Sequence, residues 1–122
     1  MADRLAAAVL IHFNSLKASC GIPASVTRGA ATIEPTIVLG RIDGTAITTR
    51  EAVLTSDRQD ILVSEADYAD LGEPVDGDTF TYDEAGKTVV VEARPQEQQD
   101  SCFYRWKGGA VFRIHCKVLS RT

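Results

Sequence analysis

The sequence predicts a mainly β domain, a small antiparallel barrel or sandwich with an N-terminal α-helix, one short helical turn and a long polar loop. Short stretches rich in β-branched residues recur along the chain, turn residues separate them, and no long helices alternate with them. The 122 residues are 44% hydrophobic and 25% charged, which suffices for one hydrophobic core. We therefore expect a helix and linker at residues 1–22 and a single β domain at residues 23–122.

The N-terminal stretch "ADRLAAAVLIHFNSLKA" predicts a helix over residues 2–18. Alanine and leucine are strong helix formers, and Cys20-Gly21 followed by Pro23 ends the pattern. Apolar residues recur at spacings of three and four and therefore share one face of the helix: Leu5, Val9, Phe13 and Leu16. Because Leu10 extends the apolar surface toward the other face, the helix is expected to be buried or to need a partner.

Strands are expected in "SVTRGAATIEPTIVLGRI", which is rich in β-branched residues and in which Gly29 and Pro35 indicate a bulge or an edge. Residues 43–60, "DGTAITTREAVLTSDRQD", are polar and contain only a weak strand candidate at residues 52–55. We interpret them as an excursion loop between strands. Long loops are uncommon in small domains unless they have a function.

The central part of the chain, "DILVSEADYADLGEPVDGDTFTYDEAGKTVVVEARP", has the clearest pattern. It predicts a strand at residues 61–63 and a helical turn in which Ser64 acts as the capping residue. Turns follow at residues 75–78 and 84–87, each before a strand. The strand between these turns alternates its side chains, so Phe80 and Tyr82 lie on one face.

The last hairpin, "SCFYRWKGGAVFRIHCKVL", is compatible with two registers. A two-residue loop at residues 108–109 pairs Tyr104 with Arg113, whereas a three-residue loop at residues 107–109 pairs Tyr104 with Phe112. The three-residue loop supplies glycine where a positive φ is needed, and we expect it for that reason. It turns Tyr104 and Trp106 toward the core and Phe103 away from it.

The residues capable of chemistry form no convincing catalytic or metal site. The three cysteines, Cys20, Cys102 and Cys116, have no disulfide framework spacing and predict free thiols, with Cys102 and Cys116 buried. His115 and Cys116 are adjacent on a strand and point to opposite faces, so they do not suit one metal ion. No nucleophile lies near a base, and no glycine-rich phosphate loop follows a strand. We expect neither an enzyme nor a bound cofactor.

Charge and segment lengths restrict the remaining classes of protein. The formal net charge of −4 argues against nonspecific binding of nucleic acid. The stretch "FYRWK" combines aromatic and basic residues, so a single-stranded nucleic-acid-binding barrel stays an alternative. The N-terminal apolar run is too short for a signal peptide or a membrane span, which predicts a protein made in the cytoplasm.

The order of these elements resembles the small head–tail joining proteins, also called head-completion or stopper proteins, of long-tailed bacteriophages such as lambda. The resemblance is carried by "SVTRGAATI", by "ILVSEADYADLGEPVDGDTFTYDEAGKTVVVEARP" and by the hairpin that begins "DSCFYRW". Its signature is a strand, a short Ser-Glu-Ala-Asp turn, "GD-x-F-T", a glycine turn and a valine-rich strand. It covers roughly residues 24–118. The C-terminal "AVFRIHCKVL" departs from the family because it indicates a full return strand.

The resemblance implies a structural virion protein of a phage or prophage. Such a protein would form a hexameric ring at the virion neck, below the portal or connector protein, where it closes the DNA exit and docks the tail. Its partners would be further copies of itself, the connector, the tail-terminator or tail-tube protein and the end of the packaged DNA, with no membrane contact. A tail-terminator or tail-tube-related protein is the alternative, because it would share the β architecture.

On this hypothesis the assembly contacts lie on the helix, in the excursion loop and at the basic C-terminal end. The helix contributes Leu5, Val9, Leu10, Phe13 and Leu16; the loop contributes Asp43, Thr48, Arg50, Glu51 and Arg58; the C-terminal end contributes Arg105 and Arg113.

Overall fold

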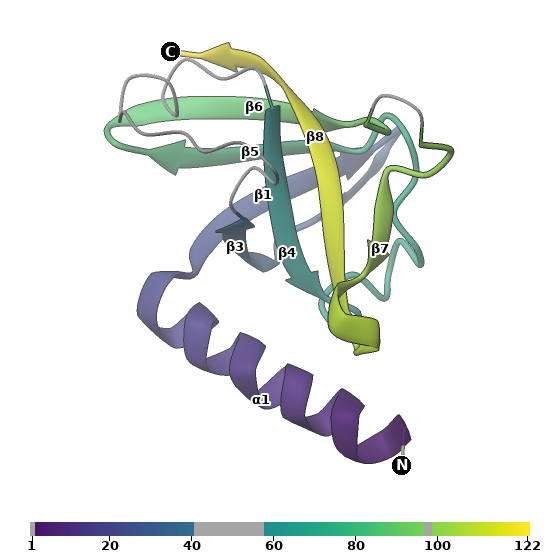
Figure 1. Ribbon diagram of the computed structural model, residues 1–122. Coiled ribbons are helices and arrows are strands. Elements are labelled where there is room, and N and C mark those ends of the chain that lie inside the picture. Colours follow the sequence, from purple (N-terminus) through teal and green to yellow (C-terminus); the bar gives the residue numbers. More distant parts are fainter. Residues whose placement is uncertain (1, 41–57, 97–98) are drawn as a thin grey trace.

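The computed structural model describes residues 2–40, 58–96 and 99–122, which form a closed six-stranded antiparallel β-barrel with one helix outside it (Figure 1). The elements are α1 (Ala2–Cys20), β1 (Ile22–Arg28), β2 (Ala31–Ile33), β3 (Thr36–Gly40), β4 (Arg58–Ser64), β5 (Thr79–Glu84), β6 (Lys87–Ala93), β7 (Phe103–Arg105), the 3₁₀ turn η1 (Trp106–Gly108) and β8 (Val111–Arg121). The barrel order is β1-β3-β4-β8-β6-β5, and β5 pairs again with β1. Strands β2 and β7 lie outside this ring, on β1 and β8. The predicted fold class is confirmed.

Helix α1 ends two residues after the predicted end, and one residue connects it to the barrel. The Gly21 N–H donates to the Lys17 carbonyl at 2.9 Å. A Cβ on Gly21 would lie 2.4 Å from that carbonyl oxygen, so this position requires glycine. Strand β1 begins at the next residue, so Ile22, which was expected in the linker, belongs to the strand.

Three tight turns follow local sequence signals. The turn at residues 75–78 closes with a 3.2 Å hydrogen bond from the Asp78 N–H to the Val75 carbonyl. Ala85 and Gly86 both have positive φ in the turn between β5 and β6, as a type I′ hairpin requires. Gly29, with φ of 59°, lies in the two-residue turn between β1 and β2. The expectation of a bulge or an edge at Gly29 is therefore wrong, because the residue reverses the chain.

Strand β4 begins at Arg58, three residues before the strand predicted at residues 61–63. Residues 58–60 were expected in the excursion loop at 43–60, but they belong to the barrel. The remainder of that loop up to residue 57, with the strand candidate at residues 52–55, lies outside the described residues. The helical turn after β4 is capped as predicted, since Ser64 Oγ accepts a 3.1 Å hydrogen bond from the Asp67 N–H.

The β7–β8 hairpin does not have the expected register, in which Tyr104 pairs with Phe112. Tyr104 pairs with Arg113, and Phe103 pairs with Ile114. The connection contains the 3₁₀ turn η1, in which Lys107 takes the positive φ of 51° that was expected of a glycine. Tyr104 therefore points away from the barrel interior and is 42% exposed. The expectation that Tyr104 and Trp106 face the core is wrong, because Tyr104 is exposed and Trp106 packs in a separate cluster with Val9 and Phe13 of α1.

The barrel interior is filled by apolar residues that alternate along the strands with outward-pointing ones. Aromatic packing at one side involves Tyr68 from the helical turn, whose ring meets Phe112 edge-on at a centroid distance of 6.1 Å. The buried core consists of Ala24, Val26, Ile37, Ile61, Val63, Tyr68, Phe80, Tyr82, Val89, Val91, Ala93, Cys102, Phe112, Ile114 and Cys116. Phe80 and Tyr82 share this interior, as the alternation predicts.

Candidate functional site

Strands β3, β4 and β8 present a second set of side chains on their outer side. Asp60 pairs with Gly40 on β3 and with His115 on β8, while Leu62 pairs with Val38 and Arg113. Pairing partners in a sheet share one face, so these rows project together and away from the barrel core. We call this surface the outer face. It consists of Val38, Gly40, Asp60, Leu62, Val111, Arg113 and His115.

The apolar half of the outer face is covered by α1. Val9 and Phe13 are buried against Val38, Leu62 and Val111 in a cluster separate from the barrel core. Burying each of these two helix side chains contributes roughly 1.5–3 kcal/mol. We call the residues that receive the helix the α1 contact surface: Val38, Leu62, Trp106, Gly109 and Val111.

Contacts at both ends of this region fix the position of the helix. His12 stacks on Trp106 of η1 with ring centroids 5.6 Å apart. A Cβ placed on Gly109 would lie 2.7 Å from a methyl carbon of Val9, so the absence of a side chain at Gly109 allows the helix to approach closely. Lys17, in the last turn of the helix, lies 3.6 Å from Asp67.

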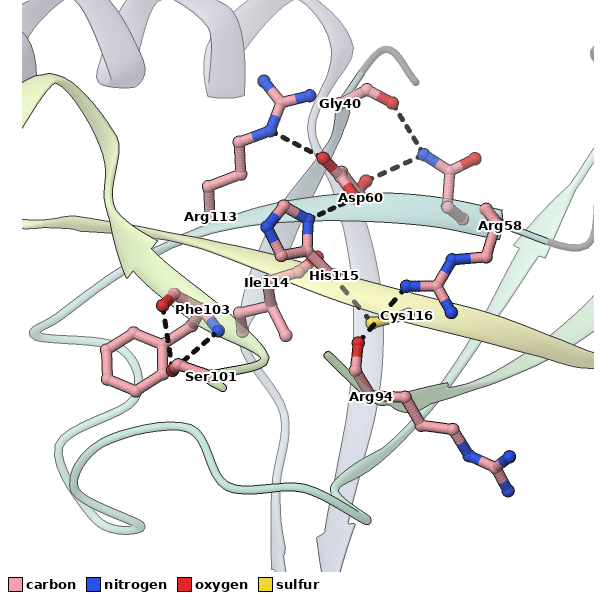
Figure 2. A network of polar contacts seen from close by, with 11 residues as sticks. Gly40, Arg58, Asp60, Arg94, Ser101, Phe103, Arg113, Ile114, His115 and Cys116 are labelled. Atoms are coloured by element: carbon pink, nitrogen blue, oxygen red, sulfur yellow. Dashed lines mark hydrogen bonds and ion pairs between the residues drawn. The ribbon is translucent and has the colours of Figure 1, made fainter. Parts of the chain in front are cut away.

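The other half of the outer face holds a buried charged cluster of Asp60, Arg113 and His115. Figure 2 shows Arg113 and His115 of β8 pointing toward Asp60 of β4. Arg113 Nε donates to Asp60 Oδ2 at 2.7 Å, and His115 Nδ1 lies 2.9 Å from Asp60 Oδ1. All three are at most 8% exposed. Gly40 leaves room for this arrangement, since a Cβ there would lie 3.2 Å from the Asp60 Cβ and 3.6 Å from the Arg113 Cζ.

The electrostatics of this cluster favour an ionised carboxylate. Burial by itself raises the pKa of Asp60, but hydrogen bonds from His115 and Arg113 outweigh it and hold the pKa below the ordinary value of 3.8. Both carboxylate oxygens are occupied, and the partners on β8 are fixed by the strand pairing. The cluster therefore acts as a structural link between β4 and β8 beside the point where residues 41–57 leave and re-enter the barrel.

A second polar cluster ties the helical turn after β4 to the barrel. Arg28 of β1 donates to both oxygens of the fully buried Asp78, at 2.7 and 2.8 Å, and to the Leu71 carbonyl at 2.6 Å. Tyr68 OH donates to Asp78 Oδ2 at 2.5 Å. Burial raises the pKa of the Asp78 carboxyl, but the hydrogen bonds from Arg28 and Tyr68 outweigh this and lower it overall. These contacts hold the helical turn after β4 against the barrel, so the turn has a structural role.

The tip of the β7–β8 hairpin combines exposed aromatic and basic groups. The Tyr104 ring lies 5.7 Å from the His115 ring, on the outer side of the barrel. Arg105 forms an ion pair with Glu65 at 2.5 Å, and Lys107 Nζ lies 4.9 Å from the Trp106 ring centroid. Exposed pairs such as Arg105–Glu65 contribute roughly 0–1 kcal/mol. Of the cations at this tip, Arg105 is therefore paired with a carboxylate, and Lys107 lies over an aromatic ring.

The predicted assembly residues that the structure describes do not lie on one common surface. On α1, Val9 and Phe13 are buried against the chain's own barrel, and Leu10 and Leu16 pack partly against the same cluster. Arg113 lies in the buried charged cluster, whereas Arg105 is exposed. Arg58 donates a 3.3 Å hydrogen bond to the Arg94 carbonyl. The side chain of Leu5 and the residues Asp43, Thr48, Arg50 and Glu51 lie outside what the structure describes.

A surface hollow and three free thiols complete the groups of the described residues that could bear on chemistry. A hollow of about 400 Å³ lies over β1 and β5, and the acids Glu34 and Asp83 are among its lining residues. Within the described ranges, no three His, Cys, Asp or Glu side chains come together as a metal site. No helix there is long and apolar enough to cross a membrane. Cys102 and Cys116 are buried free thiols, as predicted, and Cys20 is an exposed one.

The buried charged cluster was not predicted from the sequence. Its local signal is the alternation in "RQDILVS", which sets Asp60 on the face opposite Ile61, and in "VFRIHCKV", which sets Arg113 and His115 on one face. Their meeting depends on β4 pairing with β8, two strands far apart in the chain. The alternation identifies the faces, but it does not specify the pairing.

Comparison with known proteins gives no assignment. No protein-family model matches the chain, and neither a curated protein nor a solved structure matches it.

Proposed function

We propose that this protein is a structural component of the neck of a long-tailed bacteriophage or prophage. On this proposal it forms a hexameric ring below the portal or connector, closes the DNA exit and docks the tail. The proposal rests on the sequence resemblance together with the division of the chain into a complete barrel and two additions to it. Those additions are α1 and the connection between β3 and β4.

The β3–β4 connection is the observation that best supports an assembly role. Gly40 and Asp60 are direct cross-strand partners, so the two ends of the connection lie side by side. Two-residue turns join β1 to β2 and β5 to β6 in the same barrel. Residues 41–57 therefore exceed what closing the hairpin requires, and excess loop length in a small domain usually carries a function. The barrel is the scaffold that holds this segment and α1.

The experiment replaces residues 43–57 with a short Gly-Ser turn and compares the variant with the intact chain. Because Asp60 belongs to β4, a deletion reaching residue 60 would remove barrel residues and test stability instead of assembly. Each protein is added to tailless, portal-capped heads of the phage that encodes it. Head-bound copies are counted by mass measurement, and joined particles by electron microscopy and infectivity.

The proposal expects the intact chain to bind heads in a fixed multiple and to permit tail attachment. The shortened variant should stay folded but fail to complete particles. An intact chain that ignores heads and caps or lengthens tail tubes identifies a tail-terminator instead. A folded shortened variant that completes particles normally rejects the role of the β3–β4 connection.

A second candidate, binding of single-stranded nucleic acid, is favoured by one observation. The observed register exposes the Tyr104 ring on the outer side of the barrel, and an exposed aromatic ring suits base stacking. A fluorescence titration with an oligothymidine at several salt concentrations tests it, with Tyr104→Ala as the comparison variant. Salt-dependent binding that weakens in the variant supports this function, and absence of binding at low salt rejects it.

A further inference from the structure

We propose that α1 is an exchangeable arm. The α1 contact surface receives α1 of the same chain in the free protein and α1 of a neighbouring copy in an assembly. The inference deepens the proposed ring and rests on it for its biological setting. The exchange of α1 between two copies needs no other protein, so it is tested with the purified chain alone.

The first argument is that the helix and the barrel have separate cores. Among the described buried residues, those of the barrel core come from the strands, the helical turn after β4 and the residue preceding β7. Val9 and Phe13 instead bury themselves in the second cluster, on the outer face. The barrel interior is therefore filled without any α1 side chain. Release of the helix leaves the interior packing intact and uncovers only the α1 contact surface.

The second argument is the connection between the two parts. Helix α1 ends at Cys20 and β1 begins at Ile22, so Gly21 alone joins them. A change of backbone conformation at this residue moves the whole 19-residue helix, about 28 Å long, as one body. Glycine has the widest choice of backbone conformations, and short hinges of this kind favour exchange between copies.

The third argument identifies the occupant. The α1 contact surface is shaped for α1 itself, because Gly109 leaves space for Val9 and Trp106 stacks on His12. A second copy carries the identical helix, and every contact seen within one chain is available between two. A released helix exposes Val9 and Phe13, which favours its capture by another such surface.

This geometry has a direct consequence for assembly. If each copy gives α1 to the next, the contact is head-to-tail and uses two different surfaces of each subunit. Such contacts generate a closed ring when the rotation between neighbours divides a full turn. The helix would then supply the link between subunits with the same residues that pack within the free chain.

The test uses two full-length variants that are defective in opposite halves of the contact. Phe13→Asp places a charge at a fully buried helix position and leaves the α1 contact surface intact. Gly109→Val fills the space occupied by Val9 and leaves the helix intact. The two proteins are mixed in equal amounts, and the mass of the complex is measured by native mass spectrometry and light scattering. Circular dichroism verifies that both barrels are folded.

The proposal predicts a one-to-one dimer in the mixture, formed when the intact helix of Gly109→Val docks on the intact surface of Phe13→Asp. The matched control mixes Phe13→Asp with the double variant Phe13→Asp/Gly109→Val, which offers no intact helix and should give no dimer. If either barrel fails to fold, the milder pair Phe13→Ala and Gly109→Ala is mixed in the same way.

A mixture that stays at the monomer mass overturns the exchange, whatever the result of the particle assay. A dimer in the control mixture also overturns it, because the association would not need an intact α1. A dimer in the test mixture alone supports the exchange even where heads are not bound. Failure of the head–tail role and failure of the exchange are therefore told apart.

Discussion

The carboxylate of Asp60 on β4 accepts a 2.7 Å hydrogen bond from Arg113 on β8, and both side chains are almost completely buried on the outer face of the barrel. His115 occupies the second carboxylate oxygen at 2.9 Å. Among the described residues, every buried side-chain nitrogen or oxygen has a hydrogen-bond partner. The cluster is therefore satisfied as it stands, and removal of one member takes a buried hydrogen-bond partner from another.

The first prediction concerns Asp60→Asn, which keeps the size of the side chain and removes its charge. Arg113 then loses its buried ion pair with Asp60, and we expect the free energy of unfolding to fall by about 3–5 kcal/mol. Urea denaturation followed by circular dichroism measures this. The double variant Asp60→Leu/Arg113→Met removes both charges and should recover much of the loss. A cost below about 1 kcal/mol for Asp60→Asn would show that the pair is solvated.

The second prediction is a loss of stability in acid. Hydrogen bonds outweigh the effect of burial at Asp60 and Asp78 and hold the pKa of each carboxyl below 3.8 in the folded state. A depressed folded pKa contributes stability that is complete above the unfolded value and is lost as the pH falls through the folded value. We expect the urea midpoint to fall steeply below about pH 4.

The control for this pH dependence replaces the carboxylates one at a time. Asp78→Asn should lower the stability near neutral pH and flatten the acid limb of the curve. Asp70→Asn, at an exposed position, should leave that limb unchanged. An acid limb of the same slope in Asp78→Asn would contradict the assignment, because the loss would then come from other groups.

The third prediction concerns the approach of α1 to the hairpin. Gly109 has an ordinary φ of −98°, so alanine is free of backbone strain there, but its Cβ would meet Val9 at 2.7 Å. We expect Gly109→Ala to destabilise the protein by about 1–3 kcal/mol through overpacking. Val9→Ala removes the opposing methyl groups. In a double-mutant cycle, the combined variant should therefore lose less stability than the sum of the single variants.

The sequence predicts the local parts of this fold well, because local chemistry determines them. Gly77 and Gly86 take the positive φ angles that the turns observed there need, and Ser64 caps the following helical turn as its spacing predicts. The expected hairpin register is wrong because it assigns the positive φ of the loop to a glycine. Lys107 takes the positive φ, and Gly109 serves instead to admit Val9 from the helix. That second role depends on a contact between distant parts of the chain.

The candidate site was less predictable, since its members meet only through the barrel topology. The apolar face of α1 follows from its spacing, but the sequence does not say that the partner of Val9 and Phe13 is the chain's own barrel. Arg113 had been placed with the exposed basic residues, because the alternation of β8 does not reveal that β4 brings Asp60 opposite. Because β8 pairs with β4, the Arg113 side chain is buried and not on the surface.

The fourth prediction uses the cysteines as reporters of the barrel. Cys20 is exposed at the end of α1, whereas Cys102 and Cys116 are buried in the core. Burial, together with a hydrogen bond to Asp76, raises the pKa of the Cys102 thiol to about 12, and burial also raises the pKa of Cys116. Iodoacetamide reacts with the thiolate, so near neutral pH it should label Cys20 quickly and the other two only when the barrel opens.

Mass spectrometry after short exposure should therefore find one label per folded molecule, located at Cys20, and three labels after unfolding in guanidinium. Cys20→Ser should abolish the fast phase and leave the slow one unchanged. The slow phase should accelerate in Asp60→Asn, because a less stable barrel opens more often. Fast labelling of Cys102 in the native protein would mean that the strand preceding η1 separates from β8 without unfolding of the barrel, which its pairing through Phe103 and Ile114 argues against.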